Sequence, residues 1–189
     1  MPIIAGRASA AYGSGFGKVL GGAAYAGPYG SYESLATVTV GATAVSRIDF
    51  NGIPQGYKHL QVRLVAFGTS TADPKMRFND DASTSNKYMH SFYNNVSAVS
   101  TYNDNSAMPY SYNESTAPGC AIIDIFDYAN VSKNKNARTI SGYDANGAGY
   151  IFYRSQAWFA LTAINQVSFI ASSGQDFLQY SSFALYGIR

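Results

Sequence analysis

Short apolar stretches alternate with turn residues from Leu35 to the end of the chain. Positions 60, 62, 64 and 66 are apolar and most positions between them are polar, which is the period of two expected of a half-buried strand. Stretches rich in β-branched and aromatic residues predict the remaining strands. These strands are expected over residues 35–40, 45–50, 76–78, 88–93, 121–126, 138–143, 150–159, 166–171 and 182–188.

Turn signals separate these stretches, and no segment has the apolar spacing of an amphipathic helix. Asn51-Gly52 followed by Ile53-Pro54 predicts a turn, residues 127–130 predict another, and residues 144–147 have the composition of a hairpin turn. Short strands with such connections indicate an all-β protein, an antiparallel β-sandwich. A jelly roll is the favoured version, because eight strands in two sheets protect most of their edges.

The first 33 residues differ from the rest, so we expect an N-terminal arm over residues 1–33 and a sandwich domain over residues 34–189. Eight of the 18 glycines lie before residue 31, no acid precedes Glu33, and the charged residues before Glu33 are Arg7 and Lys18. A glycine-rich segment is expected to be mobile by itself. It also contains large apolar residues that a plain linker would lack, and these are Tyr12, Phe16, Val19, Leu20, Tyr25 and Tyr29. We therefore expect an anchoring arm that orders against another subunit; the alternative is a leader without function.

Residues 94–119 are rich in Asn, Ser, Tyr and Pro and have little periodicity, which predicts a long surface loop or a frayed edge. Tyrosines in or beside this loop stand among asparagines and serines, a combination that provides adaptable contacts. They are Tyr93, Tyr102, Tyr110 and Tyr112. Two interpretations stay open: the rings contact a ligand such as a glycan, or they cap the sandwich and fill a subunit interface.

Composition restricts the functional classes. The net charge of +2 is too small for a nucleic-acid footprint, and no apolar run is long enough to span a membrane. The first residues lack a charged leader, so no signal peptide is expected. Charged residues make up only 13% of the chain while aromatic residues make up 15%. Such a chain is expected to hide much of its surface in contacts.

Candidate catalytic groups are few and scattered, so we expect no enzyme. The two histidines, His59 and His90, lie near no nucleophile elbow, and His59 falls on the polar side of its strand. His90 is expected either at a sheet interface or in contact with a ligand. Asp124 and Asp127 are three residues apart, which places them on opposite faces of a regular strand, and no other carboxylate pair is linked.

No metal or cofactor is expected either. One cysteine and two distant histidines cannot make a zinc site, and Cys120, within an apolar run, is expected to be a small buried residue. Residues Asn79–Asp81 and the serines that follow gather oxygen ligands of the kind that calcium binds, but the spacing and closing Glu of an EF-hand are missing. A polar turn is the favoured interpretation of that loop.

Several segments resemble small β-rich virion proteins of tailed bacteriophages. They are residues 34–40, 53–54, 57–63, 77–79, 122–130, 141–144, 163–164 and 179–188, and the leader at residues 6–13 is similar to the start of some phage structural proteins. The resemblance implies a non-enzymatic tail-fibre or tail-appendage subunit, assembled in the bacterial cytoplasm and located in the virion. It implies a homotrimer that contacts other virion proteins and a host surface glycan. A capsid decoration or cement protein is the alternative, a free carbohydrate-binding module a further one, and a glycan hydrolase the weakest.

Overall fold

The structure, a computed structural model, describes residues 31–69, 74–83, 87–93, 100–102, 108–109, 117–144, 146, 149–171 and 174–189. Residues 32–189 form one compact unit. Its described residues form twelve strands in two antiparallel sheets and contain no helix. The all-β class and the two-sheet organisation predicted from the sequence are therefore confirmed. The expected arm over residues 1–33 lies outside the described residues except for its last three, and β1 begins at Tyr32.

The larger sheet has eight strands. Their order is β1 (Tyr32–Thr39), β12 (Ser182–Ile188), β3 (His59–Ala66), β8 (Gly119–Phe126), β9 (Lys135–Asp144), β10 (Gly149–Trp158), β5 (Lys87–Tyr93) and β6 (Ser100–Tyr102). The smaller sheet has four strands, in the order β2 (Arg47–Asn51), β11 (Gln166–Ile170), β4 (Lys75–Phe78) and β7 (Met108–Pro109). Every strand runs antiparallel to its neighbours.

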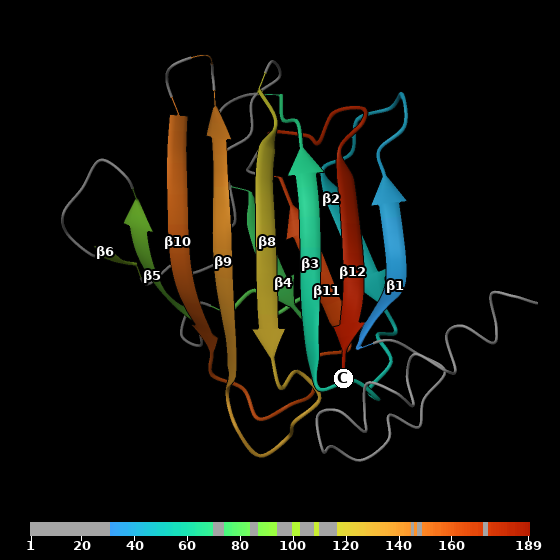
Figure 1. The fold of residues 1–189 in the computed structure, drawn as a ribbon, viewed down its shortest axis with the longest axis vertical. Helices are drawn as coiled ribbons and strands as arrows, with labels where there is room; N and C mark the ends of the chain where they lie inside the picture. The colour runs from blue at the N-terminus through green and yellow to red at the C-terminus, as the bar shows by residue number, and fades with distance from the viewer. Residues whose placement is uncertain are drawn as a thin grey trace, which may run out of the picture. The chain divides into compact units, whose positions relative to one another are not determined.

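The two sheets form a sandwich in which the smaller sheet covers only part of the larger one (Figure 1). The labelled strands of the smaller sheet, β4, β11 and β2, lie behind β8, β3, β12 and β1, whereas β9, β10, β5 and β6 lie to one side of them. Trp158 at the end of β10 still packs against Phe78 on β4, with ring centroids 5.7 Å apart. We call the side of the larger sheet that faces the smaller sheet the inner face. The opposite side, which faces the viewer in Figure 1, is the outer face.

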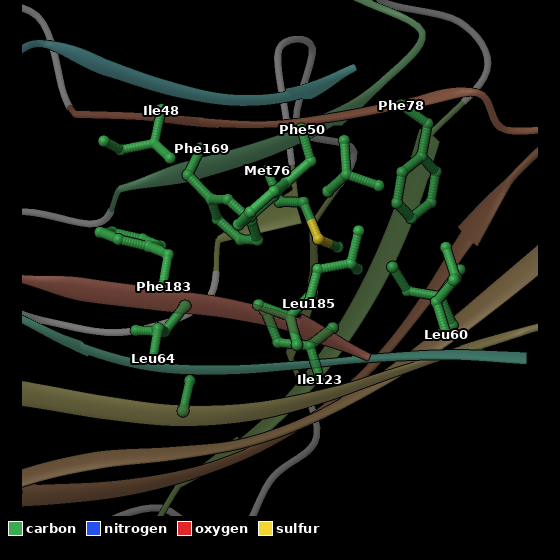
Figure 2. Packing of buried hydrophobic residues seen from close by; sticks show 14 of the residues in the cluster. Ile48, Phe50, Leu60, Leu64, Met76, Phe78, Ile123, Phe169, Phe183 and Leu185 are labelled. Carbon is green, nitrogen blue, oxygen red and sulfur yellow. The ribbon is translucent and has the colours of Figure 1, made fainter. Parts of the chain in front are cut away.

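The core fills the space between the inner face and the smaller sheet (Figure 2). Phe183 on β12 is at its centre, with its ring centroid 5.2 Å from that of Phe169 on β11 and 5.1 Å from that of Phe177. All three rings are fully buried, and each such side chain contributes about 1.5–3 kcal/mol by leaving water. Figure 2 shows side chains from both sheets converging on this space, namely Ile48, Phe50, Met76 and Phe78 with Phe169 from one side, and Leu60, Leu64, Ile123 and Leu185 with Phe183 from the other.

The strands predicted from the sequence all occur, with ends that differ by up to three residues. In β3 the alternation is confirmed, since Leu60, Val62, Leu64 and Ala66 are buried. Residues 94–119 were expected to form a long surface loop or a frayed edge. They contain β6 and β7, each the last strand of its sheet, and β8 begins at Gly119, so the loop interpretation was wrong for these residues. Strands of three and two residues are too short to show a period of two, so the sequence pattern could not reveal them.

The aromatic core allows a direct test. Replacing Phe183 by alanine (Phe183→Ala) should lower the free energy of unfolding by about 3–5 kcal/mol, because it opens a cavity against Phe169 and Phe177. Val131→Ala is the control: this side chain is 64% exposed, so its loss should change the free energy of unfolding by less than about 0.5 kcal/mol. Urea unfolding followed by circular dichroism measures both. Equal effects of the two substitutions would contradict this description of the core.

Candidate interaction surface

The outer face of the larger sheet has a patch of large apolar side chains in water. Because side chains alternate along a strand, the neighbours of the buried residues on β3, β8, β9 and β10 must point outward. Strand register places these outward residues in two adjacent rows across the sheet. Their exposed fractions lie between 44% and 55%, and the residues are Val65, Ile122, Ile140, Ile151 and Tyr153.

Small residues between these side chains make the patch concave. Ser182, Cys120 and Gly142 lie in one row with Val65 and Ile151. A side chain at position 142 would place its Cβ only 2.7 Å from the backbone oxygen of Tyr150, so glycine is required there. The result is an open depression of about 620 Å³ across β12, β3, β8, β9 and β10, which we call the outer-face groove.

A polar and aromatic cluster forms one border of the outer-face groove. The guanidinium carbon of Arg63 lies 5.4 Å from the ring centroid of Tyr32 and 5.2 Å from that of Tyr186, distances at which a cation is attracted to a ring. Arg63 Nε also donates a hydrogen bond to Gln61 Oε1 (2.8 Å), and Gln61 Nε2 donates to Asp124 Oδ1 (2.7 Å). Arg63 is therefore held at the border of the groove.

The chemistry of the outer-face groove suits an interface better than a reaction. Small-molecule sites enclose most of their ligand and place a few polar groups around it, whereas this groove is open and its large side chains are about half exposed. Contiguous apolar surface of this kind typically marks a contact with another macromolecule. The groove can therefore bind an apolar segment or surface, with Arg63 available to hydrogen-bond at the rim.

Cys120 lies on the outer face and is exposed, so its expected burial was wrong. Its strand is apolar on both faces, with Ile123 buried and Ile122 exposed on the opposite side. In the sequence such a strand gives a continuous apolar run, which ordinarily indicates burial on both faces. The same run was the signal from which the exposed apolar patch could have been inferred.

The loop at Asn79–Asp81 has the contacts of a polar turn. Asn79 and Asp80 have positive φ angles. Asn79 Oδ1 accepts hydrogen bonds from the backbone N–H groups of Asn165 (2.9 Å) and Gln166 (3.2 Å). The Asp81 carboxylate accepts hydrogen bonds from Trp158 Nε1 and from a backbone N–H, both at 2.7 Å. Protein donors thus occupy these oxygen atoms, and nowhere in the described ranges do three or more His, Cys, Asp or Glu side chains group as a metal site would require.

A second polar cluster surrounds His59 and Asp127 at one end of β3 and β8. The backbone N–H of Asp127 donates a hydrogen bond to His59 Nδ1 (3.0 Å). The hydrogen bond from the Lys133 ammonium lowers the pKa of the Asp127 carboxyl, and the charges of Lys133 and Lys58 act in the same direction, while burial opposes them. Asp127 has a φ angle of 48°, so the cluster holds a turn in an uncommon conformation.

Lys135 is fully buried next to this turn. Its ammonium donates hydrogen bonds to the backbone oxygens of Lys133 (2.7 Å) and Ala160 (3.4 Å). Burial lowers the pKa of the Lys135 amine, with a further contribution from Lys133. These contacts join the turn before β9 to the segment after β10, which is a structural role.

Most of the residues that the sequence indicated as functional lie outside the described residues. This holds for the arm residues Arg7, Tyr12, Phe16, Lys18, Leu20, Tyr25 and Tyr29 and for Tyr110 and Tyr112. Tyr93 and Tyr102 are the last residues of β5 and β6 at the far edge of the larger sheet, and His90 lies within β5. The sequence patterns did not indicate the outer-face groove as a site.

Comparisons with protein-family models, with curated proteins and with solved structures gave no match. Among the residues that the structure covers, no helix is long and apolar enough to cross a membrane.

The Asp127 cluster gives a pH-dependent prediction. Because the folded-state pKa of Asp127 lies below its ordinary value of 3.8, the charged carboxylate stabilises the fold above that pH and the contribution is lost as the pH falls through the folded-state pKa. Asp127→Asn, which tolerates the positive φ angle, should lower the free energy of unfolding by about 0.5 kcal/mol at pH 7. The difference in free energy of unfolding between the variant and the unsubstituted protein should shrink in acid, where the carboxyl is protonated. It should also shrink in 1 M salt, where the Debye length is ~3 Å. Urea unfolding at several pH values measures it, and a difference independent of pH would contradict the assignment.

Proposed function

We propose that this chain is a non-enzymatic structural subunit of a tailed-phage virion, in a tail fibre or tail appendage. The outer-face groove is the observation that supports an assembly role most directly, because a monomer in solution would leave Ile122, Ile140 and Ile151 in water. The phage context rests on the resemblance of residues 34–189 to virion proteins. The arm of residues 1–33 is the proposed anchor, and a homotrimer is the proposed state of the subunit.

We further infer that the sandwich is a jelly roll. Eight strands pair as nested antiparallel partners: β1 with β12, β2 with β11, β3 with β8, and β4 with β7. This nesting supports the inference, because a jelly roll forms when a long antiparallel pair of chain segments folds over into two sheets. On this interpretation β9, β10, β5 and β6 are additions that widen one sheet. The outer-face groove then crosses the junction between the jelly-roll strands and the added strands.

The proposed subunit contacts a host surface glycan through the tyrosine-rich residues 94–119. The position of β6 as the last described strand of the larger sheet, with β5 beside it, supports this, since loops near such an edge can reach a partner. A head decoration or cement protein is the second candidate for the role, and it uses the same groove to clamp capsid subunits. The two candidates differ in whether host adsorption depends on residues 94–119.

The location in the particle has a direct test. Mass spectrometry of gradient-purified virions that encode this chain should find it at a fixed copy number per particle, and immunogold labelling should place it on the tail. Gold on the head would favour the decoration role. Absence of the protein from purified particles would refute a structural role in the virion.

Substitution within the outer-face groove should prevent assembly without unfolding the subunit. Ile140→Lys places a charge at the centre of the patch, so it should weaken self-association roughly thirty-fold or more, as ~2 kcal/mol of desolvation implies. Leu161→Lys is the matched control, because Leu161 is also exposed, at 59%, but does not line the groove. Sedimentation velocity measures association, and circular dichroism checks the fold. Equal association of the two variants would contradict the proposed interface.

Host contact has a separate test. Replacing Tyr102, Tyr110 and Tyr112 together by serine should reduce adsorption of the phage to its host at least about tenfold, since each lost aromatic contact in a binding site costs about 1 kcal/mol or more. Incorporation into particles should be unchanged. Unaltered adsorption with normal incorporation would favour the decoration role.

A further inference from the structure

We propose that the outer-face groove binds the N-terminal segment, residues 1–30, of a neighbouring copy of this chain. The inference rests on the assembly role proposed above and names the partner of that same surface. It joins two features that are unexplained separately: an apolar groove on a folded domain, and a segment of 30 residues with apolar side chains and very little charge.

The composition of the segment complements the groove. It has two charged side chains, Arg7 and Lys18, and no acid, while the groove is lined mainly by carbon and has one charged side chain, Arg63, at its border. Glycines, eight in this segment, let a backbone lie close against a surface because they have no side chain to hold it away. Between them are residues that can fill an apolar depression, namely Ile3, Ile4, Tyr12, Phe16, Val19, Leu20, Tyr25 and Tyr29.

The point where the chain enters the sheet suits an exchange between copies. β1 is the edge strand of the larger sheet, and the ring of Tyr32, its first residue, lies on the outer face beside Tyr186 and Arg63. A segment of 30 residues spans up to ~100 Å when extended. The six neighbouring strands of the larger sheet from β1 across to β10 are together only ~24 Å wide. The segment is therefore long enough to leave the edge of one sheet and cross the outer face of the next copy.

Exchange of segments would bury both the outer-face groove and the apolar side chains of residues 1–30. Stacking of two outer faces would cover two grooves but would leave the apolar residues of both segments without a partner. When each copy donates one segment and receives one, every groove is filled, and a head-to-tail contact of this kind forms a ring when the rotation between neighbouring copies closes. A trimer is one such ring.

Cys120 provides a probe, because it is the sole cysteine of the chain and lies exposed in the groove. The full-length protein is treated with N-ethylmaleimide at a series of protein concentrations, and alkylation is followed by mass spectrometry. Alkylation should slow at least about tenfold as the protein associates. Only an open groove exposes Cys120, so a groove that is occupied about nine-tenths of the time reacts at about one-tenth of the rate. The triple variant Phe16→Ser, Val19→Ser, Leu20→Ser should react fast at every concentration. The matched control Ala8→Ser, Ala10→Ser, Ala11→Ser should stay protected.

Three results would overturn the proposal. Protection that survives the Phe16, Val19 and Leu20 substitutions would assign the groove to the folded domain of a second copy. Protection that is independent of concentration, in a species that sediments as a monomer, would assign it to the chain's own segment. Fast alkylation of the associated wild-type protein would leave the groove open in the assembly.

The segment exchange and the proposed function can be refuted independently of each other. If the protein is present in purified virions and Ile140→Lys prevents its incorporation, the assembly role stands whatever Cys120 reports about the segment. If the protein is absent from virions while Cys120 is protected as described, the segment exchange stands and the virion role fails.

Discussion

Successive side chains of a strand point to opposite faces, and this constraint determines the character of both faces of the larger sheet. Burying Leu64 and Ile123 against the smaller sheet places Val65 and Ile122 on the outer face. In most antiparallel sandwiches the outward positions are polar. Here several of the outward positions are apolar and lie beside one another in neighbouring strands. The same strand register therefore determines both the core on the inner face and the groove on the outer face. The fold and the proposed assembly role therefore have a common origin in the register of β3, β8, β9 and β10.

The second feature of this architecture is the difference in size between the sheets. The smaller sheet covers the part of the larger sheet that carries Phe183 and Leu185, while much of β9 and β10 lies to one side of β4, β11 and β2 (Figure 1). On the inner face of these added strands the polar residues Thr139, Ser141 and Gln156 are buried together with the aromatic side chains of Phe152 and Trp158. Their outer face has Ile140, Ile151 and Tyr153. The added strands thus have large apolar side chains on their outer face as well as on their inner face, as expected of strands that also serve an interface.

The sequence predicted the strands well and the candidate site poorly, and the reasons are physical. A period of two as clear as that of β3 identifies a strand and its buried side, because burial on one face imposes it. The short edge strands β6 and β7 have too few residues for any period. Cys120 was misassigned because a strand apolar on both faces has the same sequence whether its second face meets another layer of the same chain or another molecule. The full burial of Lys135 depends on backbone oxygens from two separate segments, which no local pattern encodes.

We expect the outer face of the larger sheet to be covered by another chain in the assembled virion. The most direct measurement is a density map of the virion at a resolution that places the eight strands of the larger sheet in each copy of the subunit. Density from another chain over Ile122, Ile140, Ile151 and Tyr153 is the predicted result. A map in which that face is open to solvent in every copy would contradict the account.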